Sequence, residues 1–370
     1  MKGPLSSLRV IEFCGLGPAP LAGQLLADMG AKVTVIDRAS GPEDATDVNR
    51  RGKQSLAVNL KTQTGCAIVK DLIADSDIVI EGFRPGVMER LGLGPEDCPN
   101  HLIYGRMTGW GQTGPWSQTA GHDINYLAMT GALHAIGSAD RPPPPPLNLV
   151  ADYGGGALFL VFGLLAAVIE RGISGKGQVV DAAMVDGVPA MMGLIHSLLA
   201  QGAIENRRES NWIDGAAPFY RCYECADGKY ISVGALEPQF FAELLERAGL
   251  EDKNDQYDRR HWPATVSEFA AVFKTRTRDV WARVFEGSDA CVAPVLDFAE
   301  APLHPVNQAR GVFYKSADVW QAQPAPRFSR TNPDLPAPPA APGADNKTIL
   351  KTLGYSPDQI AHLKDEGVIT

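Results

Sequence analysis

The residues that decide the fold are 8–37, with the sequence LRVIEFCGLGPAPLAGQLLADMGAKVTVID. They begin with a short apolar run, 8–13, which is followed by a turn of glycines and prolines. The spacing of leucine and alanine over 21–29 predicts a helix, and the run 31–36, rich in valine and isoleucine, predicts a second strand. A strand, a helix and a strand in this order form a β-α-β unit, whose two strands run parallel and whose helix covers one face of the sheet.

The same alternation continues further along the chain. Its apolar spacing predicts a helix over 65–74 and strands over 77–80 and 102–106. We therefore expect an α/β fold, with a doubly wound, Rossmann-like parallel sheet in a large domain of residues 1–200.

A second, smaller α+β domain is expected over residues 201–310. The sequence turns polar near 205–215, and a hairpin with its turn at Asp227-Gly228 should follow. Helices are expected at 238–248, 266–275 and 278–286. The segment 311–370 has a stretch rich in proline and alanine before a predicted helical pair, and we expect it to return to the large domain.

Two long apolar helices are expected at the end of the large domain. Residues 154–171 are small and apolar almost throughout, which is typical of a helix buried on all sides. A second helix is expected over 184–200. The five prolines 142–146 before them cannot pair inside a sheet and predict a stiff linker or surface loop.

The charge of the chain excludes several classes of partner. With 34 basic and 43 acidic residues, the net charge of −9 argues against nucleic acid and against an anionic membrane surface. We find neither a signal-like apolar start nor an uninterrupted apolar run of membrane length, so we expect a soluble, cytoplasmic protein.

Six cysteines are spread over the chain, and we expect them to be reduced thiols. Cys222 and Cys225 form a Cys-x-x-Cys pair, but no second pair lies nearby to complete a zinc site. We interpret this pair as structural and predict no metal site.

The turn after the first predicted strand imitates a dinucleotide fingerprint. Gly15 and Gly17 match its first two glycines, and Asp37 lies twenty residues past Gly17. The third glycine, which allows the helix to pack closely on the strand, is replaced by Pro20. The motif therefore argues against a nicotinamide cofactor.

Basic residues recur at the predicted sheet edges. They are Arg38, Arg50, Arg51, Lys53, Lys61 and Arg84. One interpretation is a cradle for a polyphosphate, because guanidinium groups bind phosphate with two hydrogen bonds. The alternative is an ordinary solvated charged surface, and the spacing alone favours this alternative.

A histidine and a carboxylate, His122 and Asp152, lie in two glycine-rich contexts. His122 precedes a predicted helix start with Asp123 in its first turn, a position that favours the neutral imidazole of a general base. Asp152 precedes Gly154-Gly155-Gly156. The alternatives are a hydrogen-bonded core histidine and a helix N-cap aspartate.

Four segments carry a resemblance to a known family. They are MTGWGQTGP (107–115), GHDINY (121–126), ADYGGG (151–156) and GKGQVVD (175–181). Together they resemble the racemase branch of the class III CoA-transferase family, and the similarity extends over nearly the whole chain. It implies an interlocked homodimer and an isomerase that inverts the alpha carbon of 2-methyl-branched acyl-CoA thioesters, without metal or separate cofactor, because CoA is part of the substrate.

The resemblance also implies roles for individual residues. His122 and Asp152 would be the two acid/base groups, with Asp123 beside them, and Glu237 of the small domain would orient His122 across the domain cleft. The residues that would contact CoA are Arg38, Leu56, Ala57, Lys61, Arg84, Gly121 and Tyr126.

Two other functions stay open. In the transferase branch of the family, an aspartate matching Asp152 acts as a nucleophile and carries CoA between carboxylic acids. The chain could also be a non-catalytic acyl-CoA binding protein. His122 favours the racemase, because transferases generally lack a histidine at this position.

Overall fold

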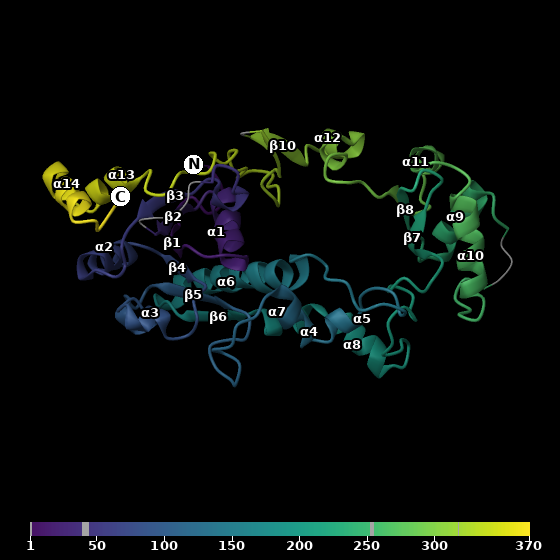
Figure 1. Ribbon diagram of the computed structural model, residues 1–370, viewed down its shortest axis with the longest axis horizontal. Coiled ribbons are helices and arrows are strands. Elements are labelled where there is room, and N and C mark those ends of the chain that lie inside the picture. Colours follow the sequence, from purple (N-terminus) through teal and green to yellow (C-terminus); the bar gives the residue numbers. More distant parts are fainter. Residues whose placement is uncertain (1, 39–43, 252–254, 317) are drawn as a thin grey trace. The chain divides into compact units, whose positions relative to one another are not determined.

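The computed structural model describes residues 2–38, 44–251, 255–316 and 318–370. These residues form two compact units (Figure 1). Unit 1 contains Met1–Thr130, Pro146–Met191 and Val306–Thr370, and unit 2 contains Gly131–Pro145 and Met192–Pro305. The chain thus passes between units near 191 and 305, whereas the predicted borders are at 200 and 310. The segment 131–145, which includes most of the proline run, belongs to unit 2.

Unit 1 is built on a six-stranded sheet in which every pair of neighbouring strands is parallel. The strands are β1 (Arg9–Phe13), β2 (Lys32–Asp37), β3 (Gln54–Ala57), β4 (Ile78–Glu81), β5 (Ile103–Thr108) and β6 (Val179–Ala183). Their order, β3-β2-β1-β4-β5-β6, is that of dinucleotide-binding folds. The predicted doubly wound parallel sheet is confirmed.

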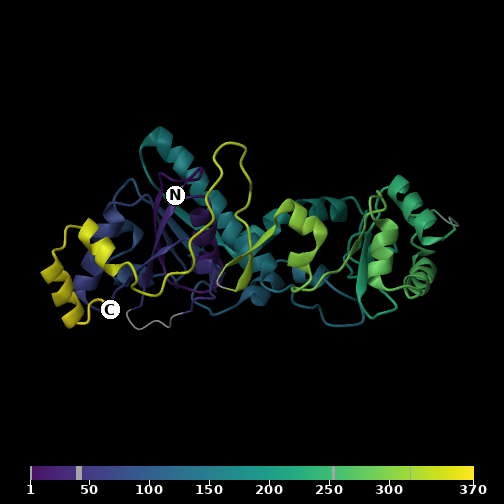
Figure 2. The same cartoon turned by 90° about the horizontal axis from the view of Figure 1, so that it is seen from above.

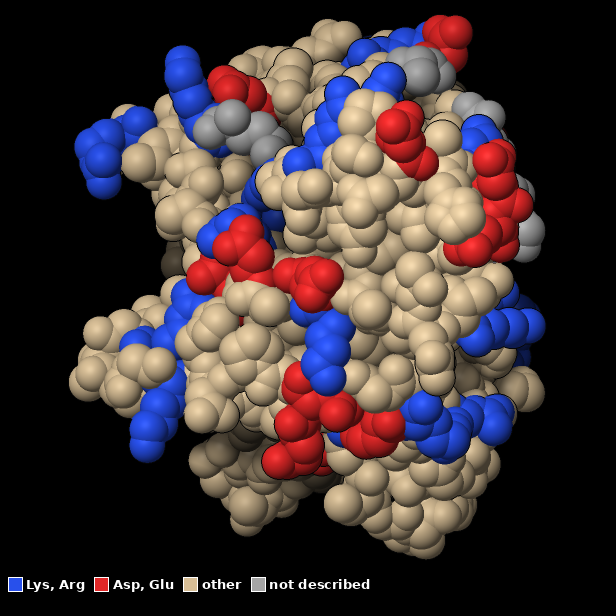
Figure 3. All heavy atoms as spheres, turned by 90° about the vertical axis from the view of Figure 1, so that its left-hand side faces the viewer, with Lys and Arg blue, Asp and Glu red and all other residues tan. Residues whose placement is uncertain are grey.

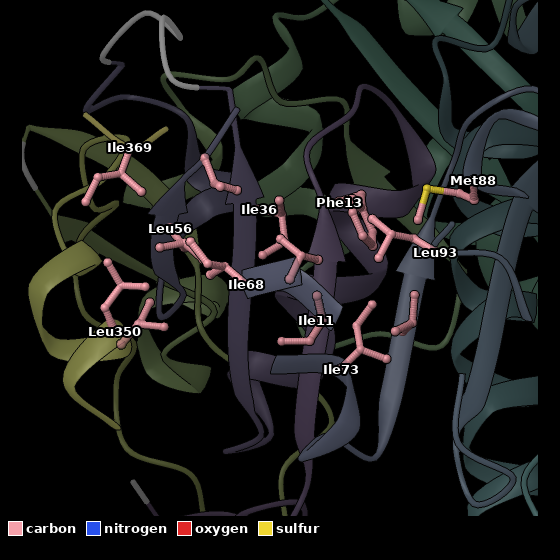
Figure 4. Packing of buried hydrophobic residues seen from close by; sticks show 14 of the residues in the cluster. Ile11, Phe13, Ile36, Leu56, Ile68, Ile73, Met88, Leu93, Leu350 and Ile369 are labelled. Atoms are coloured by element: carbon pink, nitrogen blue, oxygen red, sulfur yellow. The ribbon is translucent and has the colours of Figure 1, made fainter. Parts of the chain in front are cut away.

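Helices cover both faces of this sheet. One face packs against α2 (Gln63–Ala74), α3 (Val87–Arg90), α13 (Asn346–Thr352) and α14 (Pro357–Asp365), whose apolar side chains meet those of the strands in one core cluster (Figure 4). Because α13 and α14 contribute Leu350 and Leu363 to this cluster, the C-terminal segment returns to unit 1 (Figures 1 and 2). Helix α1 (Pro18–Asp28) packs on β1 and β2, and helix α6 (Phe159–Ser174) contacts both α1 and β5.

The helix expected over 154–171 begins earlier than predicted. Residues Leu149–Leu158 form a π-helical segment, η3, which continues directly into α6 (Phe159–Ser174). The expectation that this helix is buried on all sides is wrong for the single chain, because Phe162, Ile169 and Ile173 are 72%, 70% and 85% exposed. The run Leu149–Ser174 is also long and apolar enough to cross a membrane by length and composition alone, which corrects the expectation that no such run exists.

The second long helix is divided into α7 (Met184–Met191), which contains Pro189, and α8 (Gly193–Ala200). Helix α7 lies against η3 so closely that a Cβ at Gly187 would lie 1.9 Å from the carbonyl oxygen of Gly155. The glycines after Asp152 therefore serve this close packing of two backbones.

Three of the basic residues predicted for a phosphate cradle are partners of buried carboxylates. Lys53 Nζ lies 2.6 Å from Glu12 Oε2, with both side chains almost fully buried. Arg51 forms two bonds with Asp28, and Arg50 forms two with Asp37, all at 2.6–3.0 Å. Their charges are neutralised inside the protein, so the cradle interpretation is wrong for these three residues.

Unit 2 has its own core. The hairpin of β7 (Tyr220–Glu224) and β8 (Tyr230–Gly234) is confirmed, and β9 (Val292–Pro294) pairs antiparallel with β8. Its helices are α5 (Ala132–Ala135), α8, α9 (Pro238–Ala248), α10 (Trp262–Phe273) and α11 (Arg278–Phe285). Aromatic side chains, among them Phe219 and Trp281, fill the core.

The remaining elements are short. Helix α4 (Asp123–Ala128) follows β5, and α12 (Pro305–Arg310) precedes the antiparallel pair β10 (Phe313–Ser316) and β11 (Val319–Ala322). Three-residue 3₁₀ turns occur at Val48–Arg50, Pro95–Asp97 and Ala301–Leu303. The cysteines are free thiols, and Cys222 lies opposite Ser232 on the hairpin.

The buried Glu12–Lys53 pair gives the first prediction. Burial raises the pKa of Glu12 and lowers that of Lys53, so desolvation outweighs their attraction. Lys53→Met should lower the free energy of unfolding of unit 1 by about 3 kcal/mol or more, because it leaves a buried carboxylate without its partner. The double variant Glu12→Leu/Lys53→Met should recover most of this loss. Urea unfolding measures both.

The matched control is Arg9→Ala, which breaks the Arg9–Asp75 pair on the surface, where the side chains are 52% and 65% exposed. This change should cost less than about 1 kcal/mol. An equal effect of Lys53→Met and Arg9→Ala would contradict the prediction.

Candidate functional site

The carboxyl ends of the parallel strands bring the predicted CoA-binding arginines to one edge of the sheet. Arg38 follows β2, and Arg84 follows β4. Between them lies the turn after β1, at the point where the strand order reverses, and in such sheets ligands bind outside this point. Both arginines are exposed, and neither forms an ion pair with another residue in the described part of the chain. Their guanidinium groups are therefore available for an anionic ligand.

His122 is the N-cap residue of α4. Its amide donates to Asn125 Oδ1 at 3.1 Å, and its carbonyl accepts from the amide of Asn125 at 2.8 Å. These bonds fix the backbone and leave the exposed imidazole without a hydrogen bond to any described residue. The predicted helix start is confirmed, and the ring is free to meet a substrate.

Asp123 links this helix to the segment that carries Asp152. Its side chain is buried, with 7% exposed, and Oδ2 accepts from the amides of Ala151 and Asp152 at 2.9 and 2.8 Å. The two predicted acid/base residues are thus joined through one carboxylate.

Asp152 lies inside η3 and is not the helix N-cap, since Asn148 occupies that position. A π-helical turn of this kind is common at functional sites. A Cβ at Gly17 would lie 3.2 Å from Asp152 Oδ2, so the carboxyl faces the turn between β1 and α1. Partial burial and, next, the charge of Asp123 raise the pKa of Asp152, against smaller opposing effects of Asn148 and His122.

Gly121 and Tyr126 lie on either side of His122 in the sequence and are in contact with each other. The hydroxyl of Tyr126 donates to the carbonyl of Gly121, and its ring packs against Trp110 with centroids 4.8 Å apart. Burial raises the pKa of Tyr126, and the charge of Asp152 adds to this effect while that of Arg84 opposes it. Tyr126 thus lies within electrostatic range of the predicted catalytic and CoA-binding residues.

The remaining predicted CoA contacts are placed less favourably. The side chains of Leu56 and Ala57 are fully buried in β3, and the Ala57 amide already donates to Asn346 Oδ1 at 2.9 Å. Lys61 is exposed before α2. The face of the molecule drawn in Figure 3 has basic and acidic side chains mixed over its surface. A role for these three residues stays a prediction.

Glu237 belongs to unit 2. It is the N-cap residue of α9, with an exposed side chain, and its carbonyl accepts from the amide of Phe241 at 3.0 Å. Its predicted contact with His122 stays a prediction. Among the described residues, no group of three or more histidine, cysteine, aspartate or glutamate side chains is arranged to hold a metal ion.

Sequence reasoning missed three residues around the site. Asn148 lies close enough to the Asp152 carboxyl to lower its pKa. In the segment 107–115, the indole nitrogen of Trp110 and the side-chain amide of Gln112 are buried without a partner in the described part of the chain. The position of Trp110 and Gln112 beside glycines could have indicated these two residues from the sequence, whereas no sequence pattern pointed to Asn148.

Comparisons with known proteins identify the family of this chain. The model of CoA-transferase family III matches residues 5–346. The chain is 41% identical to the alpha-methylacyl-CoA racemase of Mus musculus, over 99% of this chain and 97% of that protein. It is 28% identical to the succinyl-CoA:glutarate CoA-transferase of Mus musculus, over 99% and 90%.

Among solved structures, a CAIB/BAIF family protein from Brucella suis superposes with a TM-score of 0.81 and 26% identity, covering 95% of this chain and all of that one. The family match spans most of the sequence, and the racemase relative spans nearly all of it. The chain therefore belongs to CoA-transferase family III.

Proposed function

We propose that this protein is an isomerase that inverts the alpha carbon of 2-methyl-branched acyl-CoA thioesters by cofactor-independent 1,1-proton transfer. The observation that carries the proposal is the Asp123 carboxylate, which joins the helix beginning at His122 to the backbone of Asp152. Two proton-transfer groups are thereby held in one site. The relative that is named a racemase and matches nearly the whole chain supports the same reaction.

The reaction passes through an enolate. A thioester spreads the negative charge of the alpha carbanion onto its oxygen, so hydrogen-bond donors suffice to stabilise it. The amide of Asp152 is already bonded to Asp123 and is not available for this task. The amides of Asp123 and Ile124 in the first turn of α4 have no acceptor among the described residues, and we assign the enolate oxygen to them.

The two groups exchange roles between epimers. Neutral His122 removes the alpha proton of one epimer, and protonated Asp152 delivers a proton to the opposite face. For the other epimer, the Asp152 carboxylate removes the proton and the imidazolium delivers it. The raised pKa of Asp152 supports this scheme, because at a given pH a larger fraction of the carboxyl is protonated and able to deliver a proton. Glu237 would orient the imidazole.

The phosphates of CoA are bound by Arg38 and Arg84 in this proposal. Both guanidinium groups are exposed at the carboxyl edge of the sheet. CoA is part of the substrate, and we propose no separate cofactor and no metal.

We also propose that the protein is a cytoplasmic homodimer. The apolar side chains exposed on α6, among them Phe162, Ile169 and Ile173, form a surface that water solvates poorly. A second copy of the chain that covers these side chains would explain why they are exposed in the single chain. Without such a cover, the same apolar residues would favour a lipid environment.

A CoA transferase is the alternative, in which Asp152 attacks the thioester as a nucleophile. It uses the same CoA site but has no need of His122. The relative named a transferase shares less of the sequence than the racemase does, so the racemase is preferred.

Isotope exchange decides between the two reactions. Incubated in D₂O with a single epimer of a 2-methylacyl-CoA and no carboxylic acid, the protein should introduce one deuterium at the alpha carbon and form the other epimer. Mass spectrometry and chiral chromatography measure these products. If CoA moved to an added acid and no deuterium entered, the transferase would be the correct function.

Substituting His122 and Asp152 one at a time should affect proton exchange at opposite faces of the alpha carbon. His122→Ala should abolish exchange from the epimer whose proton faces His122, while slow Asp152-dependent exchange persists from the other, and Asp152→Ala should do the reverse. Loss of one acid/base group should slow inversion by about 10²- to 10⁴-fold. His134→Ala, which removes an imidazole from α5, is the control. Unchanged inversion in His122→Ala would remove this residue from the mechanism.

Arg84→Ala tests the CoA site. It should raise the dissociation constant of a CoA thioester by about 10- to 100-fold, as expected for loss of a charged hydrogen bond. Binding of the matching pantetheine thioester, which lacks the nucleotide phosphates, should change little. Calorimetry measures both, with the exposed Arg90→Ala as the control. Equal weakening of the two ligands would show that Arg84 is structural.

A further inference from the structure

Asp123 has an arrangement that a simple helix-start residue does not need. An aspartate in the first turn of a helix usually faces solvent and interacts with the helix's own amides. Here the side chain is buried and bonds instead to two amides that lie 28 and 29 residues further along the chain. It therefore connects two segments that the chain does not hold together locally.

The second oxygen of this carboxylate is the more informative one. Oδ1 of Asp123 is buried and has no hydrogen-bond partner among the described residues. No arginine or lysine forms an ion pair with Asp123 in the described part of the chain, in contrast to the buried carboxylates Glu12, Asp28 and Asp37. A buried negative charge without a cation is costly, and its field reaches nearby groups with little screening.

We propose that Asp123 is a positioning residue with two effects on Asp152: it fixes the Asp152 backbone beside His122, and it holds an unpaired negative charge next to the Asp152 carboxyl. The inference rests on the proposed function and deepens it, because it explains how the two proton-transfer groups are held in place relative to each other. The first effect depends on hydrogen bonding, and the second depends on charge.

The charge has a defined consequence for the reaction. In the proposed active state the two groups together carry one proton, and the charge of Asp123 strengthens proton binding at Asp152. The groups that act on Asp152 are Asp123, His122 and Asn148, and Tyr126 lies within range. Removing the charge of Asp123 should therefore move the active pH range downward.

Two substitutions separate the effects. In Asp123→Asn the remaining carbonyl oxygen still accepts from both amides, while the charge is lost. In Asp123→Ala both the bonds and the charge are lost. Amide hydrogen exchange followed by mass spectrometry on a peptide spanning Ala151 and Asp152 reports the bonds without any substrate. Deuterium uptake by a 2-methylacyl-CoA, measured across pH with kcat and KM resolved, reports the charge.

The expected results differ between the variants. Asp123→Ala should speed amide exchange of the peptide about tenfold or more and lower kcat for alpha-proton exchange by about 10²-fold, with little change in KM. Asp123→Asn should keep the amide protection and shift the pH profile of kcat toward lower pH. Asp140→Asn, which removes an exposed charge, should leave both measurements unchanged.

Two outcomes would overturn the proposal. Wild-type amide exchange in Asp123→Ala would refute the positioning role, and a wild-type pH profile in Asp123→Asn would refute the role of the charge. If the wild-type protein moved no alpha proton at all, the proposed function would fail, but the amide measurement would still decide whether Asp123 fixes Asp152.

Discussion

The candidate site depends on one interaction. The buried carboxylate of Asp123 accepts hydrogen bonds from the backbone amides of Ala151 and Asp152. The six-residue helix α4 has little rigidity of its own, and it and the π-helical segment η3 belong to different parts of the unit 1 sequence. The hydrogen bonds of the Asp123 carboxylate hold these two segments together. His122 and Asp152 could otherwise drift relative to each other, and the proton transfer that we propose for them requires placement within a few tenths of an ångström.

Much of the fold could be predicted from the sequence because unit 1 repeats a strong local pattern. The runs around β1, β2, β4 and β5 are apolar and β-branched, as buried parallel strands require. Strands β3 and β6 were not predicted. Gln54–Ala57 is only four residues long and mixes polar and small side chains, and Val179–Ala183 is partly exposed at the sheet edge, so neither has a clear pattern. Their positions are determined by pairing with the neighbouring strands, β2 for β3 and β5 for β6.

The site was predicted less completely, for reasons of charge and burial. Arg38 and Arg84 lie where the sequence placed them, but Arg50, Arg51 and Lys53 form internal ion pairs with Asp37, Asp28 and Glu12. A sequence shows that basic residues recur but not which carboxylates the fold brings beside them. In the same way, a bond between Asp123 and an amide 29 residues away has no local signature. The catalytic and CoA-binding roles of all the candidate residues stay predictions.

Because Asp152 lies in a π-helical segment, the number of residues in that segment determines the direction in which its side chain points. Compared with an α-helix, a π-helical turn holds one additional residue, so the side chains before it are rotated by about 100° relative to those after it. If a single residue were lost from Gly154-Gly155-Gly156, an α-helical turn could form with better hydrogen bonds, yet Asp152 would face a different neighbour. Chain length in this short stretch is therefore as strict a requirement as residue identity, and an insertion or deletion there would change the chemistry without changing any acid or base.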